Sequence, residues 1–253
     1  MLPNYLHIGA AKAASTWIYR AFLEHPEIYA PPSHDNVNFF TVSYQRGLDW
    51  YEQTYFADVK NEKAVGEFSN SYHHFLPAMQ RVKEHLPNVK LGVVLRNPIE
   101  RAYLHWAHIH TKKDKKTGKG KMGFDIENGI GIPLQRLVHH HGHSWFGQFL
   151  GPGFYNCWLG LLEQYFDSSQ IFIALYDDLQ SDNAAYLRRY FEFLGVDPDF
   201  KSSYVQQYVN PESDKGKEQY GLTPKVRAEL QAIYAEDIAR LSDQLDRDLS
   251  HWK

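Results

Sequence analysis

The sequence predicts an α/β fold in which a central parallel β-sheet is flanked by helices, giving three layers. Short apolar runs at 64–68, 89–95 and 171–175 alternate with stretches of helical periodicity. A further apolar strand near the N-terminus runs directly into a turn of small residues and a helix. Continuous apolar strands between helices are typical of a parallel sheet covered on both faces. The length of 253 residues suits one domain spanning 1–253.

The first half of the chain supplies three of the predicted strands. The N-terminal strand begins at Tyr5, and a helix follows over about 15–25 and ends near Pro26. The stretch 28–40 has no periodicity and is predicted to be an irregular loop. After the strand at 89–95, Pro98 suits the first turn of a helix that continues to about residue 110, because a missing N–H costs nothing there.

The second half adds one strand and the remaining helices. An amphipathic segment at about 155–165 precedes the strand at 171–175, and a helix over about 183–194 stops at Gly195. The C-terminal helix is predicted from an N-cap at Thr223 to about residue 245. The lysine-rich stretch and its glycine-rich tail at 112–131 predict a mobile surface loop.

Composition restricts the classes of partner. A net charge of −3 argues against binding a nucleic acid, so a basic site has to be a local cluster. No run of 18 apolar residues predicts a membrane span, and no targeting segment is recognisable, so we expect a cytoplasmic protein without a membrane partner. The single cysteine, Cys157, is predicted to be a buried structural thiol, which suits a reducing compartment.

The stretch from Gly9 to Trp17 has the chemistry of an anion-binding loop. Its small residues let a phosphate approach the main chain, and the helix that follows presents unpaired N–H groups and the positive end of its dipole. Lys12 supplies a full positive charge. The lysine comes three residues after Gly9, and Ser15 follows three residues after the lysine, so the spacing differs from a Walker sequence. We therefore predict a P-loop-type fold with a modified loop.

Two further cationic features point to a ligand with two separated phosphates. Arg96 ends a buried strand, where a Walker-type enzyme usually carries a magnesium-binding Asp. Lys215 and Lys217 flank Gly216 and form a compact second anion site. We predict no metal site, because the adjacent histidines at 139–143 have no further ligand at suitable spacing.

These motifs together resemble the PAPS-dependent sulfotransferases, most closely the heparan sulfate and related bacterial branch. The resemblance covers nearly the whole chain and depends on four blocks in the expected order: the loop from Ile8 to Thr16, the segment 46–51, the segment 66–69, and the segment 96–103. It implies transfer of a sulfo group from PAPS, as co-substrate, to a hydroxyl or amine on a small-molecule or glycan acceptor. The reaction would proceed by in-line displacement and release 3′,5′-adenosine bisphosphate.

The resemblance also assigns roles to residues. Lys12 would stabilise the charge on the leaving oxygen, Lys215 would approach the sulfo group, and Arg96 with Lys217 would hold the 3′-phosphate. Gly216 would shape the second anion site. The 5′-phosphosulfate would be bound by the following residues of the loop: Gly9, Ala11, Lys12, Ala13, Ala14, Ser15, Thr16 and Trp17.

The chain departs from the family pattern at two positions. Leu104 lies eight residues after Arg96, where the family usually has a phosphate-binding serine. Asn36 lies three residues before Phe39, where the heparan branch has its catalytic glutamate, and an amide cannot accept the proton. In the segment 66–69 a phenylalanine, Phe68, replaces the usual lysine and suggests an apolar acceptor pocket.

The general base therefore has several candidates. We rank Glu67 first, then Asp35 and His34, with His73 also within the third block. An amine or acidic phenol as acceptor would need no protein base. Two other functions stay open: a P-loop nucleotide kinase, which would need a magnesium-binding carboxylate, and a non-catalytic nucleotide- or glycan-binding module. The sequence specifies neither the acceptor nor the oligomeric state.

Overall fold

The computed structural model describes residues 1–32, 34–111, 149–206, 222 and 224–252, and the loop predicted at 112–131 lies outside these ranges. The chain divides into two compact units. The first comprises Met1–Arg96 with Leu159–Val209, and the second comprises Asn97–Trp158 with Asn210–Lys253. The single-domain organisation expected for 1–253 stays a prediction.

The first unit is built on a five-stranded sheet with the order β2-β3-β1-β4-β5, in which every pairing is parallel. Tyr5 lies beside both Gly66 and Lys90, so β1 is the central strand. The carboxyl ends of β1, β3 and β4 therefore meet at one edge, where parallel α/β sheets bind their ligands. The strands are β1 (Tyr5–Gly9), β2 (Ile28–Tyr29), β3 (Ala64–Phe68), β4 (Lys90–Leu95) and β5 (Ile171–Leu175).

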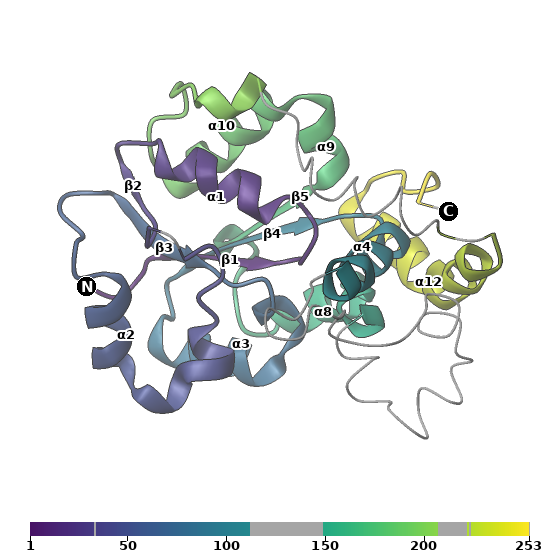
Figure 1. The fold of residues 1–253 in the computed structure, drawn as a ribbon, viewed down its shortest axis with the longest axis horizontal. Helices are drawn as coiled ribbons and strands as arrows, with labels where there is room; N and C mark the ends of the chain where they lie inside the picture. Colours follow the sequence, from purple (N-terminus) through teal and green to yellow (C-terminus); the bar gives the residue numbers. More distant parts are fainter. Residues whose placement is uncertain (33, 112–148, 207–221, 223, 253) are drawn as a thin grey trace. The chain divides into compact units, whose positions relative to one another are not determined.

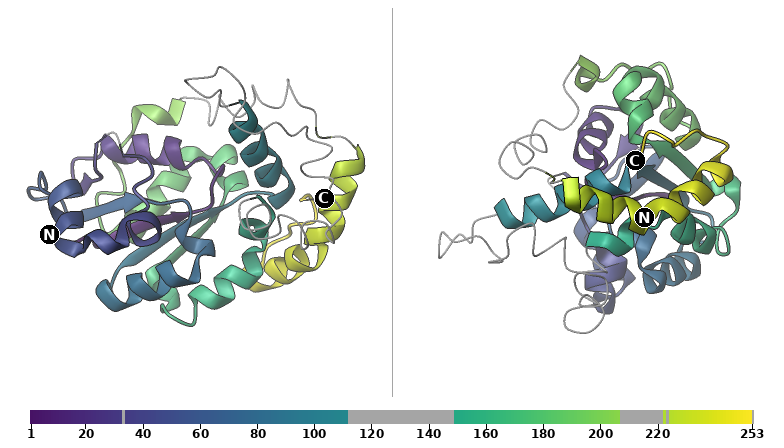
Figure 2. Two further views of the ribbon diagram at one scale, coloured as in Figure 1. Left: turned by 60° about the horizontal axis from the view of Figure 1, so that its bottom comes forward. Right: turned by 90° about the vertical axis from the view of Figure 1, so that its right-hand side faces the viewer.

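Helices cover both faces of this sheet. Figures 1 and 2 show α1 and α10 on one face and α2 and α3 on the other. Alternation along β3 sends Phe68 against Phe22 of α1 and sends Glu67 toward Tyr51 of α2. The predicted three-layer α/β fold is confirmed. The helices of this unit are α1 (Ser15–Leu23), α2 (Leu48–Tyr55), α3 (Leu76–His85), α9 (Tyr176–Ser181) and α10 (Asn183–Leu194), while α8 (Tyr155–Leu162) spans the boundary between the units in sequence.

Short helical turns fill several connections. The stretch 28–40, predicted to be irregular, contains the two residues of β2, and its last residues begin a π-helical turn. The helices α2 and α3 lie in stretches for which the sequence predicted no element. The short turns of the first unit are η1 (Phe39–Ser43, the π-helical turn), η2 (Tyr44–Arg46), η3 (Tyr72–His74), η6 (Ser168–Gln170) and η7 (Ser203–Gln206), and the second unit has η5 (Gly151–Gly153).

The core between the sheet and α1 and α10 is rich in aromatic rings. His7 of β1 stacks on Phe68 with ring centroids 4.6 Å apart, and its Nδ1 lies 3.2 Å from the Tyr190 hydroxyl. Burial, and then nearby His73, lower the pKa of His7 to about 3, so the ring is neutral. Phe68 is completely buried, and the expectation that it lines an acceptor pocket is wrong.

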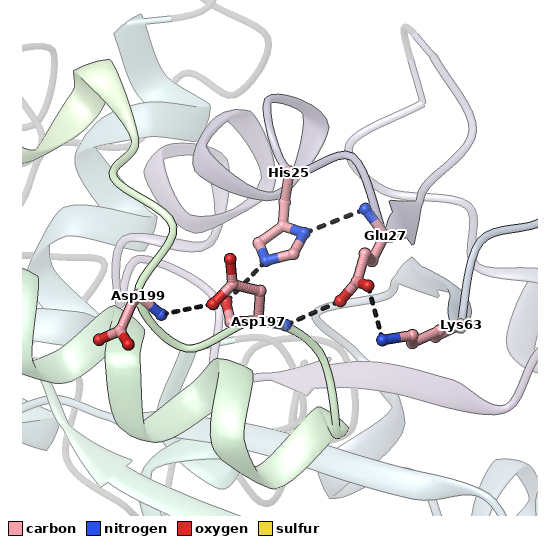
Figure 3. A network of polar contacts seen from close by, with 5 residues as sticks. All are labelled: His25, Glu27, Lys63, Asp197 and Asp199. Carbon is pink, nitrogen blue, oxygen red and sulfur yellow. Dashed lines mark hydrogen bonds and ion pairs between the residues drawn. The ribbon is translucent and has the colours of Figure 1, made fainter.

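A polar network joins loops at the amino ends of β2 and β3 (Figure 3). His25 Nε2 lies 2.9 Å from the Asp197 carbonyl, and the Asp197 N–H donates to Glu27 at 2.8 Å. Lys63 pairs with the same Glu27 carboxylate at 2.6 Å, and the Asp199 N–H donates to the Asp197 side chain. Because the strands are parallel, this network lies at the opposite edge of the sheet from the Gly9 loop.

The second unit packs α4 (Pro98–Thr111) and α12 (Pro224–Leu245) around a cluster of apolar side chains that includes Leu104, Phe149 and Leu230. Arg101 is fully buried and donates to the Phe149 carbonyl. The predicted C-terminal helix is confirmed from Pro224.

Asp237 of α12 caps the start of α8. Its carboxylate accepts the backbone N–H groups of Asn156 at 3.1 Å and Cys157 at 3.3 Å, which have no acceptor inside the helix. Cys157 itself is exposed, and its prediction as a buried thiol is wrong. Tyr155, Leu159 and Leu162 are the buried residues of this helix, while Cys157 lies on its exposed face.

Candidate functional site

The loop after β1 begins at a position that only glycine fits. Gly9 has a φ of +141°, and a Cβ there would lie 2.2 Å from His73 Nδ1. The next N–H, of Ala10, donates to the Val94 carbonyl at 2.9 Å and ties the loop to β4. The loop therefore starts in a fixed position at the carboxyl edge of the sheet.

The loop backbone forms a concavity of N–H groups. Lys12 and Ala14 have φ values of 69° and 67°, the left-handed conformation that turns neighbouring N–H groups toward a common anion. Ala14 is the N-cap of α1 and makes no side-chain capping bond. The first-turn N–H groups of α1, from Ser15 onward, have no intrahelical acceptor, so the helix dipole and these donors favour an anion.

The side chains of the helix start differ in exposure. Ser15 is buried and Thr16 is exposed at the surface. Trp17 is buried, and its indole N–H donates to the Tyr204 carbonyl of η7 at 3.2 Å. In the structure Trp17 therefore anchors the helix start to η7, while its predicted contact with the ligand stays a prediction.

Arg96 lies directly beside the loop. It follows β4, is 5% exposed, and donates from Nη1 to the Lys12 carbonyl at 3.1 Å. Its guanidinium also lies 4.2 Å from the centre of the Tyr176 ring. The structure thus places the Arg96 guanidinium against the main chain of the loop at Lys12, while the ligand contacts expected for the two side chains stay predictions.

Several predicted residues fall outside the described part of the chain or belong to the second unit. Lys215, Gly216, Lys217 and the histidines at 139–143 lie outside the described residues. Leu104 is 3% exposed within the apolar cluster of the second unit, so no hydroxyl replaces the family serine at this position. Among the residues that the structure describes, no group of three or more His, Cys, Asp or Glu side chains could hold a metal ion.

Asp35 is an exposed candidate base that contacts Thr16 at the start of α1. Its Oδ2 accepts a hydrogen bond from the Thr16 hydroxyl at 3.3 Å, and the side chain is exposed. His34 is exposed too, but its Nδ1 lies 2.8 Å from the Pro32 carbonyl and its ring packs against Tyr55. The side-chain oxygen of Asn36 accepts the Asn70 N–H at 3.1 Å.

Glu67, the first-ranked candidate, is completely buried. Its carboxylate accepts hydrogen bonds from Ser69 at 2.6 Å, Tyr72 at 2.9 Å and Tyr51 at 3.2 Å. Burial raises the pKa of Glu67 to about 7, although the three hydroxyl groups lower it in part. A buried carboxylate enclosed by donors has no open side from which an acceptor could reach it.

The raised pKa of Glu67 predicts a pH dependence of stability. Since the folded pKa lies above the unfolded one, the stabilisation is complete below about pH 4.3 and is lost as the pH rises through about 7. The measurement is urea unfolding of wild type and Glu67→Gln at pH 4.5 and at pH 8. The unfolding free energy of wild type, taken relative to that of Glu67→Gln, should be about 3 kcal/mol lower at pH 8 than at pH 4.5. His7 is present in both proteins and cancels. The same difference in unfolding free energy between the two proteins at both pH values would contradict a raised pKa of Glu67.

The sequence analysis did not predict the buried polar contacts that His73 and Glu67 make near the carboxyl ends of β1 and β3. His73, which is 2% exposed, has its Nδ1 3.2 Å from the Ile8 carbonyl and contacts Gly9. A signal for the buried network was present in the sequence, because a charged residue inside the apolar run 64–68 requires polar partners. The identity of those partners depends on contacts across the fold.

This loop, strand order and strand-end arginine define a class of protein. Residues 3–213 match the family model for the sulfotransferase domain, and the chain belongs to the sulfotransferase family.

The particular relatives include heparan sulfate enzymes. The chain is 29% identical over 214 residues to the mouse bifunctional heparan sulfate N-deacetylase/N-sulfotransferase 4, covering 80% of this chain and 23% of that protein. A human relative, the corresponding enzyme 3, is 28% identical over 80% of this chain and is likewise covered over 23% of its length. The chain therefore spans about a quarter of these curated relatives.

Solved structures share the fold. A sulfotransferase from Alicyclobacillus acidocaldarius superposes with a TM-score of 0.78 and 26% identity, covering 100% of this chain and 99% of that one. Mouse sulfotransferase SULT7A1, solved in complex with PAP, has a TM-score of 0.55 and 13% identity, covering 93% of this chain and 84% of its own. The fold prediction is thus confirmed by structures of the same family.

Proposed function

We propose that this protein transfers a sulfo group from PAPS to a hydroxyl or amine acceptor. The observation that carries the proposal is the anion-binding loop at 9–17, in which Lys12 and the N-terminus of α1 lie beside Arg96. Family membership and the N-sulfotransferase names of the mouse and human relatives support it. A strand-end arginine in place of an aspartate favours a polyanion bound without magnesium.

The proposed reaction is an in-line displacement at sulfur. The acceptor oxygen or nitrogen forms a bond to sulfur while the bond from sulfur to the bridging oxygen breaks. The electron pair of that bond stays on the leaving 3′,5′-adenosine bisphosphate. The Lys12 ammonium and the N–H groups at the start of α1 stabilise the negative charge that develops on the bridging oxygen. The acceptor proton passes to a base of the protein.

We propose Asp35 as that base. It is an exposed carboxylate, and its contact with Thr16 keeps it at the anion loop where sulfur would lie. Glu67 is less suited because it is completely buried. A base has to come within hydrogen-bond reach of the acceptor, and of these two carboxylates Asp35 has the open side.

The rest of the assignment follows the resemblance. Arg96 and Lys217 hold the 3′-phosphate, and Lys215 approaches the sulfo group. Because Leu104 supplies no hydroxyl, Arg96 carries a larger share of the 3′-phosphate contact in this chain. The acceptor is a glycan or a small molecule, and we propose no nucleic-acid or membrane partner.

The cytoplasmic location stays a prediction. No helix in the described part of the chain is long and apolar enough to cross a membrane. A relative from Dictyostelium discoideum, 31% identical over 51% of this chain, is named a membrane-associated sulfotransferase.

The activity is tested by incubating the protein with sulfur-labelled PAPS and a panel of acceptors that contains N-desulfated glycans, phenols, aliphatic alcohols and amines. We expect label in one acceptor class together with release of an equal amount of 3′,5′-adenosine bisphosphate. Absence of transfer across all four classes, with a folded protein, would contradict the proposal. Transfer of a terminal phosphate from ATP in a parallel magnesium-dependent assay would favour the kinase instead.

A further inference from the structure

The buried carboxylate of Glu67 connects two parts of the fold. Three hydroxyl groups donate to it: Tyr51 from α2, Ser69 from the residues after β3, and Tyr72 from η3. Each hydroxyl has one hydrogen to donate. Because that hydrogen points at Glu67, the lone pairs of the same oxygen are directed elsewhere.

Two of these lone pairs accept backbone N–H groups of the segment that follows Asp35. The Ser69 oxygen accepts the Asn38 N–H at 2.7 Å, and the Tyr72 oxygen accepts the Phe40 N–H at 3.0 Å. Chains of this kind, from amide to hydroxyl to carboxylate, polarise one another and strengthen each bond. The carboxylate therefore fixes which way both hydroxyls face.

The third donor holds the same segment through its ring. Tyr51 stacks on Phe39 with ring centroids 4.0 Å apart and planes inclined by 11°. The N–H of Val37 adds a bond to the Phe68 carbonyl at 2.9 Å. Each residue from 37 to 40 thus contacts β3, the residue that follows it, η3 or α2, and the contacts of residues 38, 39 and 40 described here are made with groups that donate to Glu67.

We propose that Glu67 is a positioning residue that holds the segment 36–40, and through it Asp35, against the anion-binding loop. Resting on the proposed function, this inference gives Glu67 a role distinct from that of a general base. The carboxylate acts as a hydrogen-bond acceptor, and no proton of the acceptor molecule reaches it. An uncharged side chain that still accepts should preserve the role in part.

Two substitutions separate the roles. Glu67→Met keeps the length of the side chain and removes the acceptor, whereas Glu67→Gln keeps one acceptor oxygen and removes the charge. A positioning role predicts that hydrogen–deuterium exchange of the peptide containing 36–40 is about tenfold faster in Glu67→Met and within about threefold of wild type in Glu67→Gln. The rate of sulfo transfer to the best acceptor of the panel should be lower in Glu67→Met than in Glu67→Gln, and the KM for PAPS should be unchanged in both variants.

A matched pair of tyrosines provides a test that does not depend on Glu67 variants folding. Tyr72→Phe and Tyr51→Phe each remove one hydroxyl from the same carboxylate oxygen, but only the Tyr72 hydroxyl also accepts a backbone N–H of the segment. Exchange over 36–40 should accelerate by about tenfold in Tyr72→Phe and change little in Tyr51→Phe. Equal exchange in both variants would overturn the proposal.

The exchange readout needs neither PAPS nor an acceptor. If wild type transfers no sulfo group, the proposed function fails, while exchange in Glu67→Met still decides whether Glu67 holds the segment. If Glu67→Gln exchanges like wild type and yet has lost transfer as completely as Glu67→Met, Glu67 is a base and the positioning role is wrong. Wild-type exchange in Glu67→Met would overturn it as well.

Discussion

Replacing Lys12 by alanine is expected to lower the rate of sulfo transfer by about 10²–10³-fold, the usual effect of removing one donor from a site of developing charge. The charge builds on the bridging oxygen as the bond to sulfur breaks, and the ammonium group interacts with it more strongly in the transition state than in the ground state. The measurement is kcat/KM with labelled PAPS and a saturating acceptor.

This substitution isolates the ammonium group. Lys12 has a φ of 69°, and alanine has the same conformational preference there as lysine, so the backbone strain of the loop is unchanged. Lys60, an exposed lysine at residue 60, gives the matched control, and Lys60→Ala should transfer at the wild-type rate. Wild-type transfer by folded Lys12→Ala protein would remove Lys12 from the mechanism.

Asp35→Asn is expected to lower kcat by about 10²–10⁴-fold for a hydroxyl acceptor, the usual contribution of a general base. Asparagine has the same shape and its oxygen can still accept the Thr16 hydroxyl, so the geometry of the loop should persist. Only the capacity to take the proton is lost. Binding of 3′,5′-adenosine bisphosphate, measured by calorimetry, should stay within about threefold of wild type, because the oxygen of asparagine can keep the contact with Thr16.

The exposed residue Asp58 gives a control of the same chemistry, and Asp58→Asn should leave the rate unchanged. An unaltered kcat in Asp35→Asn would contradict the assignment. A combined result, in which Asp35→Asn is active and Glu67→Gln inactive with normal exchange over 36–40, would transfer the role of base to Glu67.

The strands could be predicted closely because burial on both faces leaves a continuous apolar run. The ranges 64–68 and 171–175 coincide with β3 and β5, and 89–95 differs from β4 by one residue. The short helices α2 and α3 were missed since each has only two to three turns, with few apolar residues to establish a period. β2 has two residues and is defined only by its pairing with Ala64 and Val65.

The position of the site could be predicted, but its internal contacts could not. The loop at Gly9 and the arginine after β4 both follow strands that the sequence identified, and parallel strands bring such residues to one edge. The contact of Asp35 with Thr16 joins the start of α1 to a loop whose path no local pattern determines. Glu67 was ranked first from its match to a family block, and its complete burial depends on α2 and η3, which lie on either side of β3 in the chain.

The central claim, that this chain binds an adenosine bisphosphate through the loop at 9–17 and Arg96, is tested most directly by a thermal-shift titration. A ligand that binds only the folded protein raises the midpoint of unfolding, by an amount that grows with its concentration relative to Kd. We expect 3′,5′-adenosine bisphosphate to stabilise wild type and to stabilise Lys12→Ala and Arg96→Ala much less. Stabilisation by ATP with magnesium, and none by the bisphosphate, would contradict the account.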